Sequence, residues 1–376
     1  MIDNMFVIDA TVHPYNLAEE NLRRHPNGFG GPDLHAFALR EMLWGMHERF
    51  ATPGSAVPRE AFCTDWPPEL LAWTLFTESG VDMAVNHRLR IDSVFEDGLC
   101  NGEKNRVLAG KWPQRMIPYA GINPLLGAEA CMRELRAQVA QVPGTIGIKI
   151  YPNAGSPDRS WRLDDPEFTP FFELAKELGI RIVAVHKIVP NGLVPLAPFA
   201  IDDLETVAVR HLELSFEIVH AGLPPFVEEV ALALMRLPNV YANLEITSAV
   251  LAHGMGYVEE ALAQLISLGG AEKIIYASGA LHFHPRPVLE RMARLAFPDR
   301  VLERYGIEQI TPEQRAGFLA GNYARIAGID LAAAAEAVRD DEFARYRAGH
   351  GGDRPMWAYW RESRPELWTT APGAAA

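Results

Sequence analysis

The sequence predicts a (β/α)₈ barrel, a closed cylinder of eight parallel strands surrounded by helices. Eight short apolar runs, each followed by a helical pattern, alternate along most of the 376 residues. Three of these runs end in a histidine, namely His13, His186 and His220. Parallel strands in a barrel bring their carboxyl ends to one mouth, so we expect the three imidazoles to meet there.

The first predicted strand covers residues 6–14 and ends at His13-Pro14. The other strands are predicted at 81–86, 116–121, 146–151, 181–186, 215–220, 240–245 and 273–278. The helices are predicted at 67–79, 101–112, 128–142, 166–178, 201–210, 225–237, 257–268 and 287–295. The first of these helices has a typical start signal in Trp66-Pro67-Pro68-Glu69. Strands that alternate with helices in this way favour right-handed crossovers between parallel neighbours.

Two segments do not belong to the strand–helix alternation. Residues 14–64 form a connection much longer than usual, and we predict a lid insertion there, with an amphipathic stretch at 34–50. We expect most of its histidines, His25, His35 and His47, on the surface. The chain therefore divides into a barrel at 1–330, with the lid at 14–64, and a helical C-terminal extension at 331–376.

Composition limits the possible partners. The net charge of −13 disfavours nucleic acid and anionic membranes, and we find no basic run that would offset it. No stretch is long and apolar enough to cross a bilayer, and the first residues do not resemble a leader, so we expect a cytoplasmic protein. Three widely spaced cysteines indicate neither disulfides nor a thiolate metal site.

Several polar residues accompany the three histidines at the strand ends. Lys149 lies in the fourth strand, Glu245 ends the seventh, and His282 follows the eighth. Any single histidine here suits a structural hydrogen bond, but burying three of them costs desolvation that a shared metal would offset. We therefore predict a divalent metal on His13, His186 and His220, with zinc as the first choice and manganese or iron as alternatives.

The order of the motifs resembles the amidohydrolase superfamily, in its branch of aminocarboxymuconate-semialdehyde decarboxylase-like and resorcylate decarboxylase-like enzymes. The matching pieces are IDATVHP at 8–14, MIPYAGINP at 116–124, GIKIYP at 147–152, VH at 185–186, VHAG at 219–222, YASG at 276–279 and GNYAR at 321–325. The resemblance implies a distorted barrel with one or two divalent metals, ligated from strands one, five, six and eight. It assigns ligand roles to His13, His186 and His220.

Two positions depart from the pattern of that branch. Thr11 stands where the first strand-one ligand is expected, and Gly279 or Ser278 stands in place of the strand-eight aspartate. Neither glycine nor serine can take up a proton at neutral pH, so we assign the catalytic proton transfer to Glu245 or His282. Lys149 is interpreted as a salt-bridged catalytic residue, or as a carboxylated lysine that bridges two metals.

Two functional hypotheses follow from these residues. In the first, the chain is a metal-dependent hydrolase or C–C lyase (decarboxylase) for a small carboxylated or amide-type substrate. In the second, it is a metal-binding subunit of a hetero-oligomer that uses iron or manganese for oxidative (hydroxylase) or thioester chemistry, with the reactive site in a homologous partner. Both expect a small-molecule substrate and a homo- or hetero-oligomer.

Overall fold

The computed structural model describes residues 1–25 and 31–368 and contains one eight-stranded parallel sheet in the order β1 to β8. The strands are β1 (Ile8–Val12), β2 (Met83–His87), β3 (Met116–Ile122), β4 (Gly147–Ile150), β5 (Ile182–His186), β6 (Ser215–Val219), β7 (Val240–Asn243) and β8 (Ile274–Ile275). The segment after β8 closes the cylinder on β1, because Ala10 N donates to Tyr276 O and Gly279 N donates to Thr11 O, both at 3.1 Å. The predicted barrel is confirmed.

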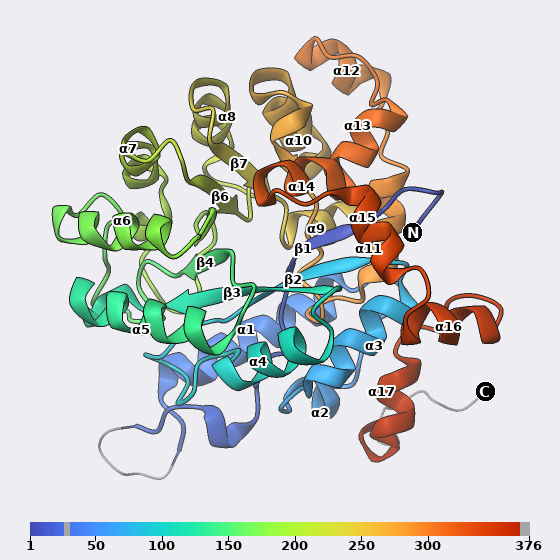
Figure 1. Ribbon diagram of the computed structural model, residues 1–376, viewed down its shortest axis with the longest axis horizontal. Helices are drawn as coiled ribbons and strands as arrows, with labels where there is room; N and C mark the ends of the chain where they lie inside the picture. The colour runs from blue at the N-terminus through green and yellow to red at the C-terminus, as the bar shows by residue number, and fades with distance from the viewer. Residues whose placement is uncertain (26–30, 369–376) are drawn as a thin grey trace.

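Helices surround the strands on the outside (Figure 1). Those that alternate with the strands are α3 (Pro68–Glu78), α4 (Gly102–Lys111), α5 (Ala128–Gln141), α6 (Thr169–Glu177), α7 (Asp202–Arg210), α8 (Val227–Arg236), α9 (Thr247–Ala252), α10 (Gly256–Gly269) and α11 (Pro285–Ala293). Each helix predicted between strands overlaps one of these. The eighth strand is shorter than predicted, since only Ile274 and Ile275 pair with β7 in register.

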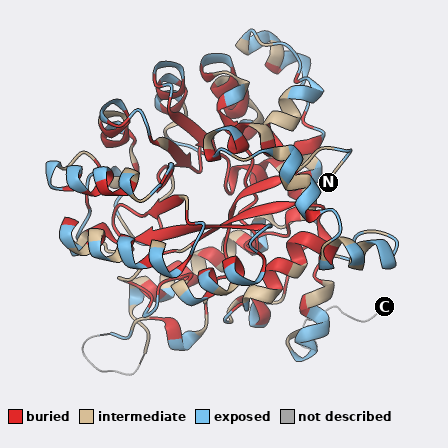
Figure 2. Cartoon of the chain, in the orientation of Figure 1, coloured by how far each residue is buried: buried red, intermediate tan, exposed pale blue. Residues whose placement is uncertain are grey.

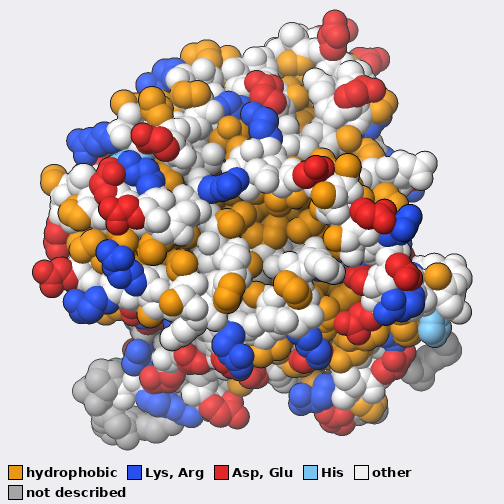
Figure 3. All heavy atoms as spheres, viewed as in Figure 1, with side chains coloured by type: hydrophobic (Ala, Val, Ile, Leu, Met, Phe, Trp, Pro, Cys, Tyr) orange, Lys and Arg blue, Asp and Glu red, His pale blue; other side chains and the backbone are white. Residues whose placement is uncertain are grey.

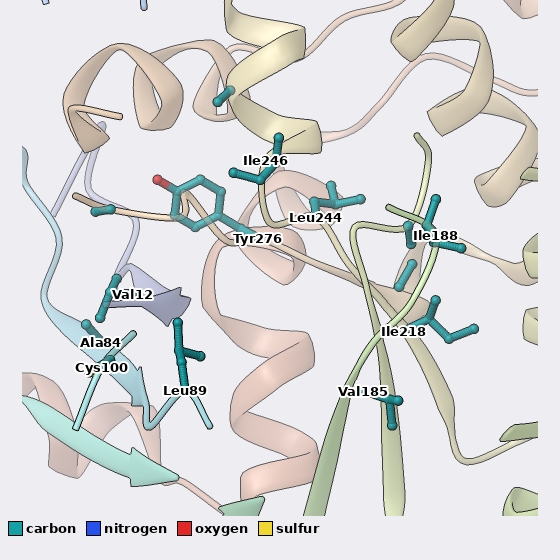
Figure 4. Close-up of a cluster of buried hydrophobic side chains, with 14 of the residues drawn as sticks. Val12, Ala84, Leu89, Cys100, Val185, Ile188, Ile218, Leu244, Ile246 and Tyr276 are labelled. Atoms are coloured by element: carbon teal, nitrogen blue, oxygen red, sulfur yellow. The ribbon is translucent and has the colours of Figure 1, made fainter. Parts of the chain in front are cut away.

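Two apolar layers hold the barrel together. Inside it, side chains such as Ile8, Val85 and Ile182 pack against α14 (Asn322–Ala327), which covers the amino-terminal end of the strands. The hydroxyl groups of Tyr119 and Tyr323 meet there at 3.0 Å. Outside, alternate strand residues pack against the helices (Figure 4). Figure 2 shows that the strands are therefore buried along almost their whole length.

The lid insertion contributes α1 (Leu34–Phe50) and α2 (Arg59–Phe62). His47 ties α1 to the loop after β8: its Nδ1 lies 2.6 Å from the backbone oxygen of His282, and its Nε2 accepts from Val57 N at 2.9 Å. Burial lowers the pKa of His47 to about 4, so the ring is neutral at physiological pH. The expectation of mostly exposed lid histidines is wrong for His47, which is fully buried.

The C-terminal extension is helical, as predicted, with α15 (Leu331–Val338), α16 (Glu342–Gly349) and α17 (Ala358–Ser363). It packs on α3, where the carboxylate of Glu78 accepts from the backbone nitrogens of Trp357 and Tyr359 at 2.7 and 2.8 Å. Figure 3 shows charged side chains of both signs mixed over one face of the molecule. In the part of the chain that the structure describes, no helix has the length and apolar character needed to cross a membrane.

Candidate active site

The polar site forms because side chains on a strand alternate between the two faces of the sheet. On β7, Tyr241 belongs to the apolar layer inside the barrel, and Asn243 and then Glu245 follow on the same face. On β5, Ala184 belongs to that layer and His186 follows it. The interior of the barrel therefore changes from apolar to polar toward the carboxyl ends of the strands, where barrel enzymes carry their active sites.

Two of the three predicted histidines enter the site only through irregular backbone. The pairing of β1 with β2 shifts between Asp9 and Val12, so that Val12 packs outside and His13 turns inward. On β6, Val219 faces inward, and strict alternation would direct His220 outward. A φ of +71° at His220 turns its ring back into the site, in a conformation that costs a non-glycine residue energy.

Glu245 lies at the centre of the site. His13 Nε2 is 2.8 Å from Glu245 Oε1, and Lys149 Nζ is 3.6 Å from Glu245 Oε2. All three side chains are buried. Burial alone would raise the pKa of Glu245, but the positive charge of Lys149, together with the neighbouring rings of His13 and His220, outweighs it and holds that pKa well below its usual range. Glu245 is therefore an ionised carboxylate that accepts a hydrogen bond from His13 Nε2.

The other two predicted histidines face each other. His186 Nδ1 is 3.0 Å from His220 Nε2, while His186 Nε2 lies 2.8 Å from Val189 O and His220 Nδ1 lies 3.1 Å from Glu245 O. Each ring must donate its proton outward to a carbonyl oxygen, which leaves two nitrogen lone pairs opposed. Burial lowers the pKa of His220 to about 4 and that of His186 well below its usual range, so no proton joins the rings at neutral pH.

This pair alone does not make a complete metal site. Across residues 1–25 and 31–368, no group of three or more His, Cys, Asp or Glu side chains is arranged to hold a metal ion. The third predicted ligand, His13, is bound to Glu245 instead, and His220 Nε2 is 3.9 Å from Glu245 Oε2. As these side chains lie, they do not fit the predicted ion on three imidazoles.

A small cavity of about 50 Å³ opens over this cluster. Its polar wall carries Glu245, His186, His220 and His282, and its apolar wall comes largely from α1, through Leu39, Met42, Leu43 and Met46. His282 is buried and has no hydrogen-bond partner at either ring nitrogen. The neighbouring His284 is also buried but does not line the cavity, and its Nε2 lies 3.1 Å from Glu78 Oε2.

Comparison with known families identifies the family of this chain. The amidohydrolase family (Amidohydro_2) matches residues 73–329, which is more than half of the chain. The chain belongs to the amidohydrolase family. The same family was expected from the order of the strand-end motifs. No curated protein matches the sequence.

Solved structures support the same fold at low identity. An uncharacterised TIM-barrel protein from Bordetella bronchiseptica shares 15% identity over 88% of this chain and 99% of its own, with a TM-score of 0.58. A 4-oxalomesaconate hydratase from Rhodopseudomonas palustris shares 17% over 88% and 99%, with a TM-score of 0.52. An amidohydrolase from Burkholderia multivorans with bound zinc shares 15% over 86% and 100%, with a TM-score of 0.50.

Beneath the candidate active site lies a second polar layer, of which the sequence interpretation missed Glu217 and Asn243. Asn243 Nδ2 donates to Thr11 Oγ1 at 2.9 Å and to Glu217 Oε2 at 2.7 Å. Asp9 accepts from the backbone nitrogen and the hydroxyl group of Ser278, so a β1 carboxylate lies beside the position where β8 lacks one. The signal for Glu217 was available, because a charged residue in the middle of an apolar strand is seldom buried without a role.

Glu217→Gln is expected to change the pH dependence of stability. Burial raises the pKa of Glu217 from 4.5 to about 7, despite the hydrogen bond from Asn243. The folded protein therefore binds the proton more tightly than the unfolded chain, and wild-type stability falls as pH rises from 4.5 to 7. Glutamine has no such loss, so the free energy of unfolding of the variant, relative to wild type, should increase by up to about 3 kcal/mol between pH 4.5 and pH 8.

Urea unfolding of both proteins at pH 4.5 and pH 8 measures this change. Asp9, whose pKa burial also raises to about 7, contributes equally to both proteins and cancels in the difference. If the free energy of unfolding of the variant differs from that of wild type by the same amount at both pH values, folding does not raise the pKa of Glu217.

Proposed function

We propose that this amidohydrolase is a hydrolase for a small amide-type substrate, with Glu245 as the residue that carries the proton. The observation behind the proposal is the state of Glu245: a buried, ionised carboxylate that lines the cavity, with Oε1 bound to His13 and Oε2 without a hydrogen-bond partner. A carboxylate oxygen left without a donor in a buried site is ready to accept a proton from water or substrate.

The residues around Glu245 have separate roles in the proposed reaction. His13 fixes the orientation of the carboxylate through Oε1, and Lys149 keeps it ionised by placing a positive charge beside Oε2. Glu245 Oε2 would take a proton from the attacking water and return it to the leaving nitrogen. Because the pKa of Glu245 is low, it is a weak base, and its protonated form is a correspondingly strong acid for the second transfer. His282, with both ring nitrogens free, is placed to bond the substrate.

The lining of the cavity supports an uncharged substrate over a carboxylated one. None of the described residues that line it is a lysine or an arginine, so a substrate carboxylate would face Glu245 without a cation from the wall. Asn191 also lines the cavity, is buried, and has no partner at either amide atom. A carboxamide group matches it, since each can both donate and accept. The volume leaves room for roughly three to five waters, which indicates a small substrate.

The opposed lone pairs of His186 and His220 support a bound cation, and we propose zinc there, with manganese and iron as alternatives. When bound, such an ion would polarise a carbonyl group or a water. The proton transfers assigned to Glu245 do not depend on this ion, because the three predicted imidazole ligands do not converge. Metal analysis by mass spectrometry should find zinc in the wild type and little in His186→Ala and His220→Ala. Equal metal content in all three proteins would contradict the proposed site.

A matched panel tests the proposed reaction. The isolated chain is incubated with small amides and with the carboxylates of the same shape, and release of ammonia or amine is compared with release of CO₂. We expect hydrolysis of amides. Release of CO₂ from carboxylates would support the lyase instead. An inactive chain that gains activity when co-purified with a homologous chain would support the hetero-oligomer hypothesis and overturn a self-sufficient active site.

A further inference from the structure

A second pocket, separate from the active-site cavity, lies on the outer side of the loop between β2 and α4. It has a volume of about 530 Å³ and is bounded by that loop, by the loop after β3, by Glu134 of α5 and by the loop after β4. Its lining is mostly polar and includes four arginines, Arg23, Arg88, Arg90 and Arg159. Concave pockets of this size commonly bind small molecules.

The charges in this pocket are unequally paired. Arg90 is held by Asp92 at 2.6 Å and by Glu134 at 2.7 Å, and Arg23 by Glu96 at 3.2 Å. Arg88, in contrast, forms no side-chain hydrogen bond or ion pair with any described residue, and its Nε is buried. Arg159 contacts only the backbone oxygen of Leu125 through its guanidinium. Asp97, the remaining carboxylate of the lining, accepts from Asn101 Nδ2 at 2.6 Å and forms no ion pair with an arginine of the lining, so the guanidinium groups of Arg88 and Arg159 remain available for a ligand.

The surroundings of Arg88 make an unpaired cation costly. Burial and the charge of Arg90 lower the pKa of its guanidinium and outweigh the attraction of Glu134, Asp92 and Asp97. Its guanidinium also lies beside Gly102, the first residue of α4, where the partial positive charge of a helix start repels a cation. An anion at this point would contact the guanidinium and relieve both repulsions.

Two glycines shape the space that Arg88 occupies. A Cβ at Gly102 would lie 3.2 Å from Arg88 Cζ, and a Cβ at Gly121 would lie 2.5 Å from Arg88 O and 2.9 Å from Arg88 Cγ. Any larger residue at 121 would therefore displace the arginine. The side chain is held in a defined slot, which reduces the entropy that a flexible arginine would lose on binding.

We propose that this pocket is a binding site for a small oxyanion, a phosphate or carboxylate group, held by the guanidinium of Arg88 with help from Arg159. Planar guanidinium groups bind both kinds of oxyanion through paired hydrogen bonds. The loop that carries Arg88 also carries Ile91 and Leu99, which line the active-site cavity. The anion site therefore borders the active site without sharing its polar residues.

Binding to the full chain is measured by calorimetry with inorganic phosphate and with acetate, each against chloride at equal ionic strength. We expect at least one oxyanion to bind, and Arg88→Met to weaken it by at least about tenfold. Arg106→Met is the matched control, because Arg106 is exposed and paired with Glu103 on α4. It should leave the affinity unchanged. Tighter binding of phosphate than of acetate would assign the ligand to phosphoryl compounds, and the reverse order to carboxylates.

A thermal melt separates loss of binding from loss of folding. Arg88 has no partner to lose, so Arg88→Met should melt at the wild-type temperature or above it. Wild-type protein that binds neither oxyanion more tightly than chloride would overturn the proposal, as would undiminished binding by Arg88→Met. A third outcome would also overturn the proposal. If the wild type binds no oxyanion but associates with another protein chain, and Arg88→Met loses that association, the pocket binds a carboxylate of that partner.

Discussion

Glu245→Gln should lower kcat by about 10²–10⁴-fold, the usual contribution of a positioned acid–base group. Glutamine has nearly the same shape and its oxygen can still accept from His13 Nε2, which lies 2.8 Å from Glu245 Oε1. What the variant loses is the ionised oxygen Oε2, the proposed proton acceptor. Steady-state kinetics on the amide identified by the substrate panel would measure the effect, with kcat separated from KM.

The matched control for this variant is Glu217→Gln. Glu217 is a buried carboxyl in the same barrel, bound to Asn243 and absent from the residues that line the cavity. It should retain most of the activity, although its stability changes with pH as argued above. Wild-type turnover by Glu245→Gln would remove Glu245 from the mechanism and leave His282 as the remaining candidate.

Lys149→Met should lower the free energy of unfolding by about 3–5 kcal/mol, because it leaves the buried Glu245 carboxylate without its cation. Lys149 Nζ is 3.6 Å from Glu245 Oε2, and both side chains are almost completely buried. Methionine fills much of the same volume, so the loss would report the charge rather than a cavity. Urea unfolding at neutral pH is the measurement.

A double-mutant cycle separates the pair from its surroundings. Lys149→Met combined with Glu245→Gln removes both charges and should recover a large part of the lost stability. Lys176→Met is the comparison, because Lys176 pairs with Glu173 in a partly exposed position, 2.9 Å apart, and should cost less than about 1 kcal/mol. Equal losses at Lys149 and Lys176, or strict additivity in the cycle, would show that the buried pair contributes no special stability.

The arrangement of strands and helices was predictable because it depends on local patterns. Apolar runs of strand length that alternate with amphipathic helices have few other ways to bury their surface, and each predicted strand corresponds to one in the structure. The family followed from the order of short motifs and is supported by the match over residues 73–329. The lid was also expected, but the buried role of His47 was not, since its partners lie at Val57 and His282.

The sequence by itself determined which side chains stand at the carboxyl ends of the strands: His13, Lys149, His186, His220 and Glu245. The tertiary structure decided how they pair. The shifted register of β1, the positive φ of His220 and the approach of Lys149 to Glu245 depend on how strands far apart in the chain pack against one another. Alternation along a strand is a local property that can be read residue by residue, whereas the bulges and turns that change it are fixed by packing across the barrel.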